Sequence, residues 1–118
     1  MIHTRPGEAS LSVPIRYDGD TVVVEIRGEL DLATAPLLRD TLGQLIAEGA
    51  LAILVDAGEL EFVDTKGLSA LVDAAGELIA RGGELSVANV RPAARRLLEL
   101  TGADWVLAPE EELGVPRI

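Results

Sequence analysis

The chain carries apolar residues at two different spacings, and each spacing predicts a different kind of element. Residues 11–17 and 21–27 have the alternating or β-branched pattern that is typical of strands. The sequence Asp18-Gly19-Asp20 between them is a turn signal. The two strands are therefore expected to form an antiparallel hairpin.

Helical spacing begins after this hairpin. A first helix is predicted between Gly28 and Gly49, with Pro36 in its first turn and Thr34 available as its cap. Its apolar positions are Leu37, Leu38, Leu42, Leu45 and Ile46. Gly49 marks the expected end, since glycine commonly follows the last turn of a helix.

Two further helices follow the same logic. One is expected from about residue 66 to residue 81, and Gly82-Gly83 stops it. Its apolar face consists of Leu68, Leu71, Val72, Ala75, Leu78 and Ile79. The other spans residues 92–100 and ends at Gly102. It directs Ala93, Ala94, Leu97 and Leu98 inward and Arg91, Arg95, Arg96 and Glu99 outward.

Short apolar runs between these helices predict more strands. Residues 51–55 and 84–88 have strand length, and residues 105–107 form a candidate edge strand. Strands that alternate with helices imply crossover connections and hence parallel neighbours. The predicted fold class is α/β, with a mostly parallel sheet and one antiparallel strand pair.

Length and composition fit a single domain. A chain of 118 residues buries roughly two-thirds of its unfolded surface in one core. With 48% hydrophobic but 3% aromatic residues, that core consists of aliphatic side chains. The domain is expected over residues 11–108, with polar tails at residues 1–10 and 109–118.

The sequence has no cysteine, which excludes disulfides and thiolate sites and fits a cytoplasmic protein. It contains neither a signal-peptide h-region nor an apolar run long enough to enter a membrane. The net charge of −10 repels nucleic acid, so direct binding to DNA or RNA is not expected. A partner with a basic face would be attracted instead.

The most informative segment is residues 56–70, where acidic and small residues lie between a strand and a helix. Open α/β sheets place their sites at such points. Asp64 or Thr65 could cap the helix, whose first turn has unpaired N–H groups and also favours a phosphate. A threonine at this point is a candidate switch.

Three motifs in this order resemble the bacterial anti-sigma factor antagonists that are built on the STAS domain. They are G-E-L-D-L-A-T-A-P at residues 28–36, F-V-D-T-K-G-L at residues 62–68, and R-P-A-A-R-R-L-L-E-L-T-G at residues 91–102. The resemblance extends over residues 21–107. It implies a STAS-type fold, in which about three main helices pack on a mixed, mostly parallel sheet of about four or five strands.

The resemblance also implies a function. Members of that family bind an anti-sigma factor, often itself a serine kinase, and so release a sigma factor to RNA polymerase. Phosphorylation reverses the binding, usually at a Ser or Thr directly before the glycine of a D-[ST]-[ST]-G pattern. This chain reads Asp64-Thr65-Lys66-Gly67, so Lys66 occupies the usual acceptor position and has no hydroxyl.

Three explanations of this departure are open. Thr65 could have become the phosphoacceptor, or the protein could be permanently active. Alternatively, Lys66 marks another branch of STAS proteins, which includes cytoplasmic subunits of lipid-transporting ABC systems with a D-T-x-G-L pattern. Permanent activity or another branch is favoured over phosphorylation, because a helix cap is the simpler role for Thr65.

Five residues make up the predicted partner surface. Asp31 matches an acid that lies close to the phosphoacceptor in the family, and Gly67 suits a close backbone approach. The surface consists of Asp31, Asp64, Thr65, Lys66 and Gly67. A homodimer through the edge strand at residues 11–17 is a further hypothesis.

Catalysis finds little support in the sequence. The single histidine is His3, in a predicted tail, and no Ser/His/Asp arrangement surrounds it. The acid pairs Asp56 with Asp64 and Glu59 with Glu61 are the remaining candidates for acid–base or metal chemistry, but a solvated acidic rim is the favoured explanation. No enzyme activity, cofactor or metal is expected. The two functional hypotheses are therefore an anti-sigma factor antagonist and a transporter subunit bound to its ATPase.

Overall fold

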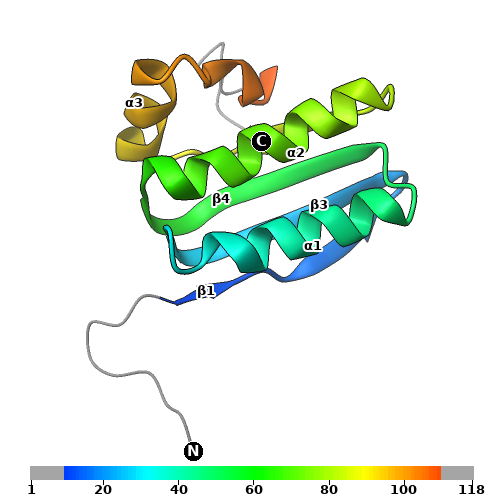
Figure 1. Cartoon of the computed structure of the whole chain (residues 1–118), viewed down its shortest axis with the longest axis horizontal. Coiled ribbons are helices and arrows are strands. Elements are labelled where there is room, and N and C mark those ends of the chain that lie inside the picture. The colour runs from blue at the N-terminus through cyan, green and yellow to red at the C-terminus, as the bar shows by residue number, and fades with distance from the viewer. Residues whose placement is uncertain (1–9, 110–118) are drawn as a thin grey trace, which may run out of the picture.

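The computed structural model describes residues 10–109, which form one mixed sheet with helices packed against it (Figure 1). The strands are β1 (Leu11–Ser12), β2 (Ile15–Asp18), β3 (Thr21–Leu30), β4 (Ala52–Val63) and β5 (Glu84–Ala88). The helices are α1 (Ala35–Ala47), α2 (Thr65–Ala80) and α3 (Pro92–Leu100), followed by the 3-10 helix η1 (Asp104–Val106). Residues 1–9 and 110–118 of the predicted tails lie outside the described residues.

The sheet has the order β1-β3-β4-β5, and β2 also pairs with β3. Strands β2 and β3 form the predicted antiparallel hairpin, in which Asp18 is paired with Thr21 across a two-residue turn. The pairs β3–β4 and β4–β5 are parallel, so helices α1 and α2 are their crossover connections. The predicted α/β class with a mixed, mostly parallel sheet is confirmed.

The predicted first strand is interrupted. Pro14 separates β1 from β2, because it has no N–H to donate to β3. Its carbonyl still accepts a hydrogen bond from the Glu25 N–H at 2.9 Å, so both short strands remain on the same side of β3.

One face of the sheet is covered by α1 and α2, which lie side by side across β3 and β4 (Figure 1). Strand residues that alternate toward this face are buried, as period 2 requires. These are Val22, Val24 and Ile26 of β3 and Ile53, Val55 and Ala57 of β4. From the helices they meet Leu38, Leu42, Leu45, Ile46, Leu71, Ala75 and Leu78, all in one apolar core.

Two residues predicted to face this core are exposed instead. Leu37 is 44% exposed, because it lies about 100° around α1 from the buried Leu38. Ile79 is 57% exposed at the margin of the buried stripe of α2, which runs through Leu71 and Leu78. Both errors come from reading helical spacing without knowing where the buried face is centred.

The C-terminal third also differs in detail from the prediction. Helix α3 has the expected bounds, but Leu98 is its only fully buried residue and Ala93 is exposed. The predicted strand at residues 105–107 is wrong, since residues 104–106 form η1. After this tight turn Leu107 forms a single parallel bridge with Val87, whose carbonyl oxygen accepts a hydrogen bond from the Ala108 N–H at 2.9 Å.

The largest correction concerns β4. A strand was expected over residues 51–55 and an irregular segment after it, yet β4 continues to Val63. The acidic residues Asp56, Glu59 and Glu61 break the apolar run that sequence analysis relies on. They do not break the strand, because Glu59 and Glu61 are exposed and Asp56 is only partly buried.

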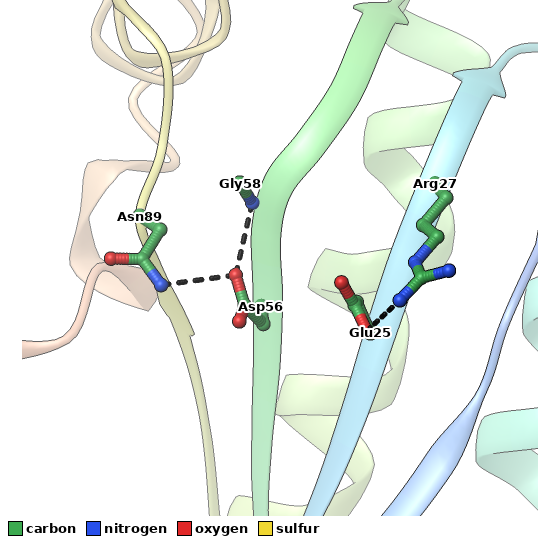
Figure 2. Close-up of polar contacts among 5 residues, drawn as sticks. All are labelled: Glu25, Arg27, Asp56, Gly58 and Asn89. Carbon is green, nitrogen blue, oxygen red and sulfur yellow. Dashed lines mark hydrogen bonds and ion pairs between the residues drawn. The ribbon is translucent and has the colours of Figure 1, made fainter.

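A bulge in β4 accompanies this extension. Glu25 of β3 is paired with Asp56, but Arg27 is paired with Glu59, so β4 contains one extra residue around Gly58. On β3, the Arg27 guanidinium donates a 3.0 Å hydrogen bond to the Glu25 carboxylate (Figure 2). This hydrogen bond, together with the charge of Glu25, raises the pKa of Arg27.

Side chains from β4 and from the connection between β5 and α3 hold the bulge. Asp56 Oδ1 accepts hydrogen bonds from the Gly58 N–H and from Asn89 Nδ2, both at 3.0 Å (Figure 2). Arg91 Nε donates to the Gly58 carbonyl oxygen at 3.0 Å. We call Asp56, Gly58, Asn89 and Arg91 the bulge network. It ties the second half of β4 to the connection between β5 and α3.

The start of α2 is fixed to the end of β3. The Asp64 N–H donates to the Leu30 carbonyl oxygen at 3.1 Å, and Asp64 Oδ1 accepts from the Gly67 N–H at 2.8 Å. Of the two predicted cap residues, Asp64 is therefore the cap of α2, and the capping role favoured for Thr65 is wrong. A Cβ atom on Gly67 would overlap the Leu30 carbonyl group and lie 2.7 Å from its carbon. Only glycine permits this approach.

Substitutions at two glycines of α2 test the contact between Gly67 and the Leu30 carbonyl group. Gly67→Ala should lower the free energy of unfolding by about 1–3 kcal/mol, because the new methyl group displaces the helix from β3. Gly76→Ala is the matched control, since nothing lies within 4 Å of its Cβ position. It should raise stability by about 0.5–1 kcal/mol. Urea denaturation measures both, and equal effects of the two substitutions would refute the contact.

The bulge network makes a second prediction. Asp56→Ala leaves the Gly58 N–H and the Asn89 amide without their acceptor and should destabilise the domain by about 1–3 kcal/mol. Glu59→Ala, at an exposed position on the same strand, should change stability by less than about 0.5 kcal/mol. Thermal unfolding of the two variants would contradict the assignment if their midpoints were the same.

Candidate functional site

The five predicted site residues lie where β3 and β4 end and α1 and α2 begin. Figure 1 shows these strand ends and helix starts at the same end of the sheet. Leu30 and Val63 are register partners at the ends of these parallel strands. Asp31 and Asp64 directly follow them, so the structure brings together two segments that are 33 positions apart in the sequence. This is the edge at which open α/β sheets bind ligands.

Asp31 shapes the loop that leads into α1. Its Oδ1 accepts hydrogen bonds from the N–H groups of Ala33 at 3.0 Å and Thr34 at 3.1 Å. The Thr34 hydroxyl accepts from the Asp31 N–H at 2.9 Å and donates to the Glu29 carbonyl at 2.8 Å. Thr34 precedes α1 as predicted but does not cap it with its side chain. The loop instead holds Leu32 outward, 69% exposed.

Thr65 and Lys66 form the exposed first turn of α2. Within residues 10–109, neither side chain has a hydrogen-bonding or ion-pair partner. Lys66 is also the only lysine in the chain. An ammonium group in the first turn opposes the helix dipole, so its position is not explained by helix stability. The site thus presents a hydroxyl and a cation to solvent on a rigid, capped helix start.

An apolar part of this edge was missed by sequence analysis. Phe62, the only phenylalanine, is 51% exposed near the end of β4. It lines a groove of about 190 Å³ between β4 and the start of α3. The other lining residues are Leu60, Glu61, Val63, Arg91, Ala93 and Ala94. The sequence does contain a signal, because Phe62 is the only phenylalanine and belongs to the motif at residues 62–68. Its exposure could not be predicted, because it depends on the continuation of β4 to Val63.

The acid pairs considered for chemistry do not form a site. Asp56 serves the bulge network and Asp64 caps α2, so each carboxylate has a structural role. Among the described residues, no group of three or more His, Cys, Asp or Glu side chains is arranged to hold a metal ion. His3 lies outside the described residues. No helix within residues 10–109 has the length and apolarity needed to cross a membrane.

Comparison with known proteins identifies the family of the chain. A protein-family model described as "Mlab, STAS domain" matches residues 14–108. The anti-sigma-F factor antagonist RsfB of Mycobacterium tuberculosis (strain H37Rv) is 30% identical over 95 residues, which are 80% of this chain and 77% of RsfB.

Two solved structures extend the comparison. An anti-sigma factor antagonist from Mycobacterium paratuberculosis has a TM-score of 0.76 and 28% identity, with 89% of this chain and 92% of that chain covered. The anti-sigma factor antagonist SpoIIAA in its unphosphorylated form has a TM-score of 0.73 and 26% identity, with 86% and 92% covered. The resemblance carried by the three sequence motifs is confirmed, and the chain belongs to the STAS domain family, together with relatives that are anti-sigma factor antagonists.

Proposed function

We propose that this protein is an anti-sigma factor antagonist, which binds an anti-sigma factor and so releases a sigma factor to RNA polymerase. The exposed start of α2 carries the proposal, because the motif that identifies the family ends in this rigid, solvent-facing turn. Thr65 and Lys66 form the exposed centre of the binding surface, while Asp31, Asp64 and Gly67 fix the loop and the helix start that present them. The protein acts by binding and not by catalysis, in keeping with relatives that are named as antagonists.

Charge supports a partner with a basic face. The chain carries 20 acidic and 10 basic residues, and such an imbalance accelerates encounter with an oppositely charged protein. Against this background Lys66 is a local exception at the centre of the surface. It provides a point contact for a carboxylate of the partner, and it would specify how the two proteins are aligned.

Lys66 also bears on regulation. Phosphorylation at the usual family position would add a charge of about −1.5 to −2, whereas lysine places a positive charge there. The substitution thus gives position 66 the opposite sign to the phosphorylated state. This supports permanent antagonism. Thr65 is the remaining hydroxyl in this turn and is exposed, so it is the alternative phosphoacceptor.

The second candidate function is a STAS subunit of a lipid-transporting ABC system, bound to its ATPase. It is favoured by the run Asp64-Thr65-Lys66-Gly67-Leu68, which has the D-T-x-G-L form of that branch. The named relatives favour the first candidate instead.

Affinity purification of the tagged protein from its own cells, followed by mass spectrometry, separates these candidates. An anti-sigma factor that is enriched and then binds the purified protein supports antagonism, and a transport ATPase in its place refutes it. The mass of the purified protein reports phosphate on Thr65. Light scattering tests the hypothesis of a homodimer through the edge strand predicted at residues 11–17, which the structure divides into β1 and β2. All four residues of β2 are exposed.

Charge reversal at the two ends of α2 tests the binding surface. Lys66→Glu should raise the Kd for the anti-sigma factor about tenfold or more, because it removes a cation and adds a repelling carboxylate. Arg81→Glu makes the same change in net charge at the opposite end of the helix, where Arg81 is also exposed. Calorimetric titration should find the control within about twofold of wild type. Similar losses in both variants would mean that only net charge matters.

A further inference from the structure

The groove between the end of β4 and the start of α3 is lined mainly by apolar side chains. It is open because the first turn of α3 carries two alanines, Ala93 and Ala94, opposite Phe62 and Val63. Beneath it lies a smaller cavity of about 20 Å³, which Leu60, Val63 and Ala94 also line. The floor of the groove is therefore apolar. Of the charged residues, only Glu61 and Arg91 line it.

The walls of the groove are held in place. Arg91 precedes α3 and donates from Nε to the Gly58 carbonyl, which joins the helix start to the bulge in β4. Asp56 joins the same bulge to Asn89. Leu98 anchors the other end of α3 in the core. A recess with walls fixed in this way loses little entropy when it is filled, which is the requirement for an anchor site.

The size and position of the groove indicate what kind of group would fill it. About 190 Å³ is less than the roughly 300–1,000 Å³ of pockets that hold small molecules, but it suits one large apolar side chain. Such anchor side chains dominate protein interfaces. Val63 lines the groove, and Asp64, Thr65 and Lys66 follow it directly in the chain. The groove is therefore continuous with the binding surface at the start of α2.

We propose that the groove formed by Leu60, Phe62, Val63, Ala93 and Ala94 receives a large apolar side chain of the anti-sigma factor that binds the α2 surface. This inference rests on the proposed function and adds a second element to it. Lys66 and its neighbours provide polar alignment, while the groove provides apolar burial. The exposed half of Phe62 becomes covered in the complex, which contributes to affinity through the area removed from water.

The test uses the anti-sigma factor that the affinity purification identifies, in purified form. Ala93→Glu places a carboxylate over the groove without harming the fold, since position 93 is exposed and acidic residues are favourable in the first turn of a helix. Ala80→Glu is the matched control. It makes the same substitution at an exposed site about 22 Å along α2 from Thr65. Phe62→Ala removes part of the groove wall.

The expected result is that Ala93→Glu and Phe62→Ala each raise the Kd about tenfold or more, while Ala80→Glu stays within about twofold of wild type. Circular dichroism should find all variants folded. Tight binding by the Ala93→Glu protein would overturn the groove and leave the antagonist function standing. If the wild-type protein binds no anti-sigma factor, both proposals fail. Loss of a homodimer in the Ala93→Glu protein, with binding intact, would make a second copy the occupant and overturn this inference.

Discussion

The contact between Gly67 and the carbonyl group of Leu30 is the constraint on which the rest of the structure depends. It places the first turn of α2 directly against the end of β3, and the Asp64 N–H reinforces it by donating to the same carbonyl. Asp31 follows Leu30, so the loop it shapes lies beside that turn. A side chain at position 67 would separate these two parts, and the exposed Thr65 and Lys66 would lose their fixed relation to Asp31.

On the other side of the site, the bulge network fixes the start of α3 against β4. Asp56 and Arg91 satisfy the two backbone polar groups of Gly58 that the change in register leaves outside the strand pairing. Because Arg91 lies at the start of α3, the bulge sets where that helix stands relative to β4. The groove and the α2 surface are thus each fixed by hydrogen bonds between segments that are distant in sequence, in addition to local bonds such as the Asp64 cap.

These constraints explain how the proposed partner surface is built from the described residues. Carboxylates that sequence analysis considered for chemistry, Asp56 and Asp64, are occupied with backbone N–H groups and hold the scaffold together. The groups exposed at the proposed partner surface are the Thr65 hydroxyl, the Lys66 ammonium, Leu32 and part of Phe62. This combination suits recognition by another protein, in which an apolar anchor contributes affinity and charge contributes alignment.

The sequence by itself determined the class of fold, the three helices, the hairpin and the candidate residues at the start of α2. Each of these depends on local patterns: alternation over a strand, helical periodicity, a proline near a helix start or a glycine after its end. Only the tertiary structure decided that β4 continues through Asp56 and Glu61, that Thr34 bonds within the Asp31 loop, and that Phe62 borders a groove with Ala93. These features depend on strand register and on contacts between distant segments, and local spacing contains no information about which residues a neighbouring element will cover.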